Sequence, residues 1–184
     1  SVLGIPLFLE AVGAPLLRRI GDEWHAGRLT PAQEHLATAA VQRVVAGAMI
    51  ALPAPAGAPT IVIATLAGER HEIGAVLAAA AAAAEGWRVI YLGADLPAGE
   101  IAAAALGTRA DAVGVSIIFP ADRERVLDEL RALRTLLPAS TPLLVGGAGA
   151  GTLAPQLTEL GARVVADLPG LGATLHDVGA AKAA

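Results

Sequence analysis

Apolar residues recur with a helical period along the first fifty positions of the chain. From Leu3 to Ile20 they return every three to four residues, which predicts a helix. A second helix is predicted to begin at Thr30, where TPAQ supplies a capping threonine, a proline at the first helical position and a glutamine at the third, and to run to about Ile50. Gly27 breaks the pattern between them. Residues 1–52 are therefore expected to form a small helical unit.

The pattern changes after the PAPAGAP segment at residues 53–59, which we interpret as a stiff linker. Strands that are apolar on both faces are typical of a parallel sheet covered by helices on both sides. We therefore expect residues 60–180 to form a doubly wound α/β domain with a five-stranded parallel sheet, which binds ligands at the carboxyl ends of its strands. The predicted strands are TIVIAT, WRVIYLG, DAVGVSII, PLLVGG and ARVVA, and the predicted helices cover about 72–85, 98–106, 122–137 and 153–160.

Two helices alone bury little apolar surface, so the helical unit needs a partner. It is expected to pack on the α/β domain, on helices upstream of this sequence or on another subunit. The sequence begins at Ser1 rather than methionine, directly in an apolar pattern, and we expect it to be a piece of a longer protein.

Composition narrows the possible functions. The net charge of -4 and the lack of any run of Lys or Arg argue against a nucleic-acid surface. The absence of cysteine excludes disulfides, thiolate metal sites and cysteine nucleophiles, which leaves the four histidines as the only soft ligands. No apolar run is long enough to span a bilayer, and the start lacks the pattern of a signal peptide. We expect a soluble cytoplasmic protein without membrane contact.

The loop after the first predicted strand carries unusual chemistry. In a dinucleotide-binding domain this loop reads G-x-G-x-x-G, whereas here it reads GERHEIG, and the glycine-rich VGGAGAG follows the fourth strand instead. His71 at this edge is a candidate general base, metal ligand or solvent-exposed residue. Glu69 favours a metal ligand, because a metal-bound imidazole usually donates its other N–H to a carboxylate. Gly74 leaves the following helix open to close approach by a ligand.

The ERHEIG segment at residues 69–74 resembles the D/E-x-H-x-x-G motif of cobalamin-binding domains. In that family the histidine displaces the cofactor's dimethylbenzimidazole and becomes the lower ligand of cobalt, a role that the resemblance gives to His71. The family also has a serine on the third strand and a Gly-Gly pair after the fourth, which line the slot for the displaced nucleotide tail. Here the matching residues are Ser116, Gly146 and Gly147. Beside these motifs, we assign Glu72, Ile73 and Ile118 to the same site. Glu69 stands where aspartate is commoner.

Trp24, His25, Glu34 and His35 form a W-H-x8-E-H pattern across the predicted helix break, which can bring the two helix ends to a common pocket. The pattern is similar to the W-x9-E-H motif of CarH-type light-sensing transcriptional regulators, which bind adenosylcobalamin through a helical bundle and a cobalamin domain. The resemblance implies that the helical unit caps the upper corrin face. Trp24 would lie against the adenosyl group, Glu34 would accept ribose hydroxyls, and His35 would support the pocket.

The same resemblance implies how such a module works. Light would break the cobalt–carbon bond, and His25 would then become the upper cobalt ligand and change the conformation. The module would be a photoreceptor and not an enzyme, without catalytic residues, and its adenosyl form would be a homo-oligomer. DNA would be contacted only through a domain absent from this sequence. The family's bundle has four helices, whereas about two are predicted here.

Each residue of the W-H-x8-E-H pattern also has an ordinary structural explanation. Trp24 can be a packing residue at a helix end, Glu34 a favourable charge in a first helical turn, and His25 a favourable partner for a helix C-terminus. His176 and the segment ADRERVLDEL are expected to be solvent-exposed.

Two other classes of protein compete with the regulator. The first is a corrinoid methyl carrier, or the cobalamin-binding subunit of a methyltransferase or mutase. Methyl carriers cap the corrin with apolar side chains, and a mutase needs a substrate barrel that this sequence does not encode. The second is a flavodoxin-like phosphate or nucleotide binder without cobalamin.

Overall fold

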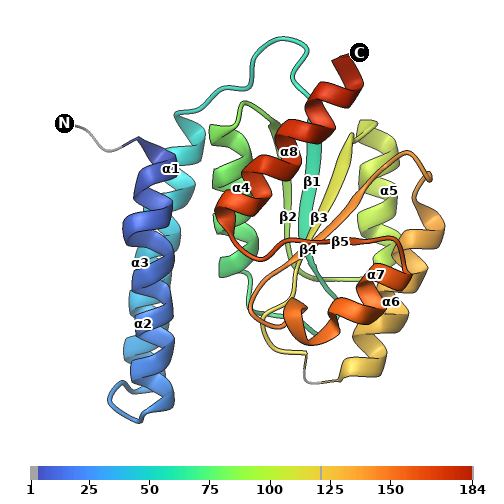
Figure 1. Ribbon diagram of the computed structural model, residues 1–184. Coiled ribbons are helices and arrows are strands. Elements are labelled where there is room, and N and C mark those ends of the chain that lie inside the picture. The colour runs from blue at the N-terminus through green and yellow to red at the C-terminus, as the bar shows by residue number, and fades with distance from the viewer. Residues whose placement is uncertain (1–3, 121, 184) are drawn as a thin grey trace.

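The computed structural model describes residues 4–120 and 122–183 (Figure 1). Its N-terminal part is one continuous helix in three segments: α1 (Ile5–Phe8), a π-helical turn (Leu9–Gly13) and α2 (Ala14–His25). Leu3, where this helix was predicted to begin, lies outside the described residues. The helix continues past Ile20, where its apolar period ends, to His25, just before the break expected at Gly27, and its last turns carry mostly polar residues.

The second helix, α3 (Pro31–Ile50), begins where the sequence predicts. The hydroxyl oxygen of Thr30 accepts from the backbone N–H of Gln33 at 3.3 Å, and the Gln33 side chain accepts from the backbone N–H of Thr30 at 2.9 Å. This reciprocal cap satisfies two backbone donors at the start of the helix. Gly27, with φ of +71°, lies in the turn that reverses the chain between α2 and α3.

The five predicted strands are present and form a parallel sheet in the order β2-β1-β3-β4-β5. This order reverses direction between β1 and β3, and in doubly wound folds the crevice at such a point binds the ligand. The strands are β1 (Thr60–Leu66), β2 (Arg88–Leu96), β3 (Ala112–Ser116), β4 (Leu143–Gly146) and β5 (Arg163–Val164). The sheet and its helices confirm the predicted α/β fold with a preceding helical unit.

Helices cover both faces of the sheet (Figure 1). On one face α4 (Ile73–Ala84) and α8 (Leu168–Ala183) pack on alternate residues of the central strands. On the other face lie α5 (Ala98–Thr108), α6 (Arg123–Leu136), a short 3-10 turn (Ala150–Leu153) and α7 (Ala154–Glu159). Sequence reasoning missed α8, whose glycines disfavour a helix locally. Leu171 and Leu175, both buried against the sheet, hold it in place.

The helical unit packs on the outer face of α4. Leu9 and Val45 are buried there against Val76, Leu77 and Ala80. The sequence left three possible packing partners for the helical unit, and in the structure the unit packs on the α/β domain. No helix within residues 4–120 and 122–183 combines the length and apolar character needed to cross a membrane.

Candidate functional site

His71 lies on the loop between β1 and α4, at the point where the sheet order reverses. Its Nδ1 lies 2.6 Å from Oε1 of Glu69. Because an ionised carboxylate only accepts hydrogen bonds, the neutral ring carries its proton on Nδ1 and keeps a lone pair on Nε2. The His71 side chain is 60% exposed, so this lone pair is accessible to a ligand. The imidazole is thus prepared to coordinate a metal, with its tautomer fixed by a carboxylate.

Glu69 is buried, with a side chain only 3% exposed. Its carboxylate accepts from the backbone N–H groups of Ile118 at 2.9 Å, Phe119 at 2.7 Å and His71 at 2.9 Å. Burial by itself raises the pKa of Glu69, but these hydrogen bonds and the one from the His71 ring outweigh it and leave the pKa below its ordinary value. The ionised carboxylate therefore ties the His71 loop to the loop that follows β3.

A second group of contacts, which sequence reasoning missed, holds the start of the His71 loop. The buried hydroxyl of Thr65 donates to the carbonyl of Glu69 and accepts from the backbone N–H of Asp95 at 3.0 Å. The Asp95 carboxylate accepts from the backbone N–H of Gly68 at 2.7 Å, with Arg70 3.6 Å away. The bond from Gly68 and the charge of Arg70 lower the pKa of Asp95, although partial burial opposes them. Asp95 adopts a left-handed conformation with φ of +62°, which aspartate tolerates better than most residues.

Gly74, the second residue of α4, lies close to the end of β3. A Cβ added at Gly74 would be 2.5 Å from Oγ of Ser116 and 3.0 Å from Cδ1 of Ile118. Ser116 is buried, and its hydroxyl has no hydrogen-bond partner among the residues that the structure describes. A buried polar group without a partner is unusual and suits a site that a polar ligand completes.

The glycine pair at the end of β4 is required by the close approach of neighbouring backbone segments. Gly147 has φ of +97°, and a Cβ there would lie 2.3 Å from the carbonyl oxygen of Ile117. A Cβ at Gly146 would lie 3.2 Å from the carbonyl oxygen of Val165. Gly147 therefore allows the loops after β3 and β4 to approach closely, whereas Gly146, which pairs with Ser116 in the sheet, leaves room for the segment after β5.

Trp24 and His25 end α2, and their rings meet edge to face with centroids 4.7 Å apart. Trp24 is 42% exposed. The Nδ1 of His25 lies 2.8 Å from the carbonyl oxygen of Gly21, which can only accept a hydrogen bond. The neutral ring of His25 therefore also carries its proton on Nδ1 and keeps a lone pair on Nε2.

Glu34 and His35 lie in the first turns of α3. The Glu34 carboxylate accepts from the hydroxyl of Thr38 at 2.8 Å, and Nδ1 of His35 lies 2.8 Å from both Oε2 of Glu34 and the carbonyl oxygen of Pro31. The two pairs of the W-H-x8-E-H pattern share one end of the helical hairpin. Among the described residues, no hydrogen bond joins one pair to the other or to His71.

The hairpin extends beyond the edge of the sheet at which His71 is exposed. The side chain of Gln42 on α3 donates to Glu72, the residue after His71, at 2.7 Å. The turn at Thr30 lies about 18 Å further along the hairpin, because an α-helix rises about 1.5 Å per residue. In Figure 1 this turn lies at the same end of the molecule as the carboxyl ends of the strands. The four residues of the pattern therefore lie at the tip of the hairpin, where Trp24, His25 and His35 are exposed and Glu34 is half-buried.

Two further predicted site residues have structural contacts. Glu72 has both carboxylate oxygens engaged, one by Gln42 and the other by the hydroxyl of Tyr91 at 2.7 Å. Burial and the Glu72 carboxylate raise the pKa of Tyr91. Ile73, the first residue of α4, is half-buried against the helical unit.

The donor set around His71 fits a metal that brings its own ligands. Within the described part of the chain, no three His, Asp or Glu side chains are grouped so that they could hold a metal ion. A bare ion would therefore find only one strong ligand at His71. A metal already bound by a macrocycle needs only that one.

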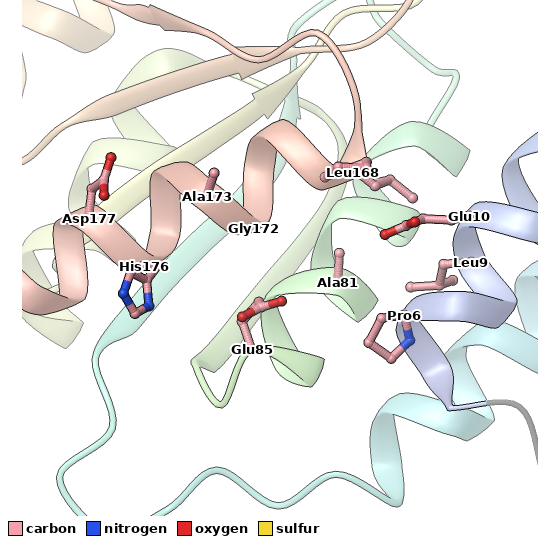
Figure 2. A pocket seen from close by; sticks show the side chains of 11 residues that line it. Pro6, Leu9, Glu10, Ala81, Glu85, Leu168, Gly172, Ala173, His176 and Asp177 are labelled. Atoms are coloured by element: carbon pink, nitrogen blue, oxygen red, sulfur yellow. The ribbon is translucent and has the colours of Figure 1, made fainter.

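A separate cleft of about 370 Å³ lies between the helical unit, α4 and α8 (Figure 2). Glu10, Glu85 and Asp177 line it together with His176, which is exposed as the sequence predicts. The cleft lies at the C-terminal end of α4, whereas His71 precedes the N-terminus of that helix. It is therefore separate from the His71 site.

Comparison with family models matches most of the chain. Residues 59–173 match a B12 binding domain model, and residues 7–47 match a second B12 binding domain model. The chain is 39% identical over 144 residues to the HTH-type transcriptional repressor CarH of Myxococcus xanthus, covering 77% of this chain and 47% of that protein. It is 35% identical over 167 residues to the repressor CarA of the same organism, covering 89% of this chain and 54% of that protein. The chain thus spans about half the length of these relatives.

Solved structures share the fold at low sequence identity. The monomethylamine corrinoid protein of Methanosarcina barkeri matches with a TM-score of 0.75 at 18% identity, over 95% of this chain and 84% of that one. A cobalamin-binding protein from Desulfitobacterium hafniense matches with a TM-score of 0.58 at 18% identity, over 95% of this chain and 82% of that one. At this identity the likeness shows the arrangement of helices and strands.

Proposed function

Because this chain belongs to the B12-binding domain family, we propose that it is the cobalamin-binding, light-sensing module of a transcriptional regulator. One observation carries the proposal. His71 is held by a buried carboxylate at 2.6 Å and presents its free ring nitrogen at the ligand-binding edge of the sheet. We assign His71 as the lower ligand of cobalt.

The residues behind His71 fit the displaced nucleotide tail of the cofactor. The unpartnered hydroxyl of Ser116 offers it a hydrogen bond, and the absence of a Cβ at Gly74 leaves room beside that hydroxyl. Gly146, Gly147 and Ile118 border the same place. Glu69 keeps the imidazole in the tautomer that ligation requires.

The helical tip is assigned to the upper face of the corrin. When bound, adenosylcobalamin supplies a cobalt–carbon bond that light breaks. Trp24 offers a half-exposed apolar ring to the adenosyl group, and Glu34 offers acceptors to its ribose hydroxyls. His25 keeps a lone pair on Nε2 and is the residue of the tip that we assign to the upper face after illumination, with His35 in a supporting role.

The output is proposed to be regulatory and not enzymatic. The relatives CarH and CarA are transcriptional repressors by name, and both are about twice as long as the matched region. We propose that the adenosyl form of this module assembles with copies of itself in the cytoplasm. DNA would be bound by a domain outside the sequence described.

Absorption spectroscopy tests the lower ligand. The purified chain mixed with adenosylcobalamin in the dark should give the spectrum of cobalamin whose lower ligand is a protein histidine. His71→Ala should abolish that spectrum and tight binding, whereas His176→Ala, an exposed histidine elsewhere, should change neither. A His71→Ala variant that binds with the unchanged spectrum would overturn the assignment.

Illumination tests the upper face. Green light should change the spectrum and oligomeric state of the unaltered chain. His25→Ala should bind normally in the dark but release cobalamin faster after illumination, and Trp24→Ala should lose preference for the adenosyl form over the methyl form. If His25→Ala retains cobalamin as well as the unaltered chain, His25 is not the upper ligand.

A corrinoid methyl carrier is the second candidate, because its fold is shared at a TM-score of 0.75. The polar side chains of Glu34, His25 and His35 at the tip favour the regulator, since a methyl carrier is expected to cap the corrin with apolar groups. Methyl transfer from a donor with no response to light would establish the carrier instead.

A further inference from the structure

Glu72 joins three parts of the molecule. It follows His71 and precedes α4, and its Oε1 accepts from Nε2 of Gln42 on α3 at 2.7 Å. Its Oε2 accepts from the hydroxyl of Tyr91 on β2 at 2.7 Å. One carboxylate therefore links the helical unit, the His71 loop and the sheet.

The rest of this interface gives little directional control. The face of α4 that the helical unit covers is built from aliphatic side chains, with Val76, Leu77 and Ala80 beneath Leu9 and Val45. Such contacts depend on buried area and tolerate small sliding or rotation of packed helices. Hydrogen bonds to a charged carboxylate are directional and stronger than neutral ones.

We propose that Glu72 is a positioning residue that, through Gln42 and Tyr91, fixes the orientation of the helical unit relative to the His71 loop. The hairpin tip lies about 18 Å from Gln42 along α3. A small rotation about this contact therefore displaces Trp24 and His25 by a larger distance. The role of the tip as a cap over a cofactor rests on the proposed function. The Gln42–Glu72–Tyr91 contact is seen in the structure and is independent of it.

Thiol labelling of the chain without cofactor tests this role. The chain has no cysteine, so Val45→Cys introduces a single thiol at a position that is 0% exposed, between α3 and α4. A thiol reagent reaches it only when the helical unit moves away. Gln42→Glu keeps the size of the side chain but sets a second carboxylate against Glu72. We expect labelling to be about tenfold faster or more, the factor that corresponds to a lost charge-assisted hydrogen bond.

The exchanged variant provides a rescue. In Gln42→Glu with Glu72→Gln, the donor and the charged acceptor have traded places, so the contact can form again and the labelling rate should return close to its original value. Arg43→Leu, a change at the adjacent exposed position of α3, should leave the rate unchanged.

A second thiol separates local movement from general loss of stability. Val113→Cys on β3 is also 0% exposed but lies in the sheet. Gln42→Glu should leave its labelling unchanged. An unchanged rate at Val45→Cys, an equal increase at Val113→Cys, or no recovery in the exchanged variant would each overturn the proposal. Because no cobalamin is present, these outcomes are independent of the spectra that test the proposed function.

Discussion

Replacement of Gly74 by alanine tests whether the contact between α4 and β3 belongs to the binding site. The added Cβ would lie 2.5 Å from Oγ of Ser116, so one of the two groups must move. Overpacking of this kind costs about 1–3 kcal/mol of folding free energy, against a gain of about 1 kcal/mol from alanine in a helix. We expect Gly74→Ala to be about 0–2 kcal/mol less stable and to bind adenosylcobalamin about tenfold more weakly or worse.

A second substitution separates stability from binding. Ser116→Ala removes the oxygen that the new methyl group meets, and the next nearest atom is the flexible end of Ile118 at 3.0 Å. It also removes a buried hydroxyl that has no partner among the described residues, which should stabilise the cofactor-free chain by about 1 kcal/mol. The Gly74→Ala, Ser116→Ala double variant should therefore regain stability while its binding of adenosylcobalamin stays weak.

The measurements are urea unfolding of the cofactor-free chain and titration with adenosylcobalamin in the dark. Gly99→Ala is the matched control, because Gly99 is also the second residue of its helix, and a Cβ there would meet nothing within 4 Å. It should gain up to about 1 kcal/mol in stability without a change in affinity. If Gly74→Ala binds adenosylcobalamin as tightly as Gly99→Ala, the place beside Ser116 is not part of the site.

Two other substitutions test residues that hold the loops around the site, Glu69 for the His71 loop and Gly147 for the loop after β4. Glu69→Gln should lower the free energy of unfolding by about 2–3 kcal/mol, because a buried carboxylate that accepts several hydrogen bonds is lost. Glu124→Gln, at an exposed position, should have little effect in the same urea titration. Equal stability of the two variants would contradict the role of Glu69. Gly147→Ala should lower the free energy of unfolding by about 2–6 kcal/mol, since it combines left-handed strain with a Cβ 2.3 Å from a carbonyl oxygen. Gly151→Ala is the control, because a Cβ at that position would meet nothing within 4 Å. A melting temperature unchanged by Gly147→Ala would refute this reasoning.

Features that depend on neighbouring residues could be predicted from the sequence. The apolar runs of the strands, the capping residues at Thr30 and the Glu69-x-His71 spacing each act over a few positions, and the structure contains the corresponding strands, cap and hydrogen bond. The change in hydrophobic period likewise predicted helices followed by an α/β fold, which is the order of elements in the structure. The roles of His25 and Trp24 stay predictions, because nothing in the chain alone tests a contact with a cofactor.

Only the tertiary structure decided how these parts meet. The strand order β2-β1-β3-β4-β5 places the loop of His71 beside the end of β3, so Glu69 reaches backbone N–H groups about fifty residues away. Asp95 and Thr65, like Gln42 and Glu72, lie about thirty residues apart, and no local pattern marks such pairs. Helix α8 likewise forms from a glycine-containing segment because the sheet buries its leucines. Local sequence sets which backbone conformation each segment prefers, whereas the pairing of distant polar groups depends on the packing that brings them together and removes water from them.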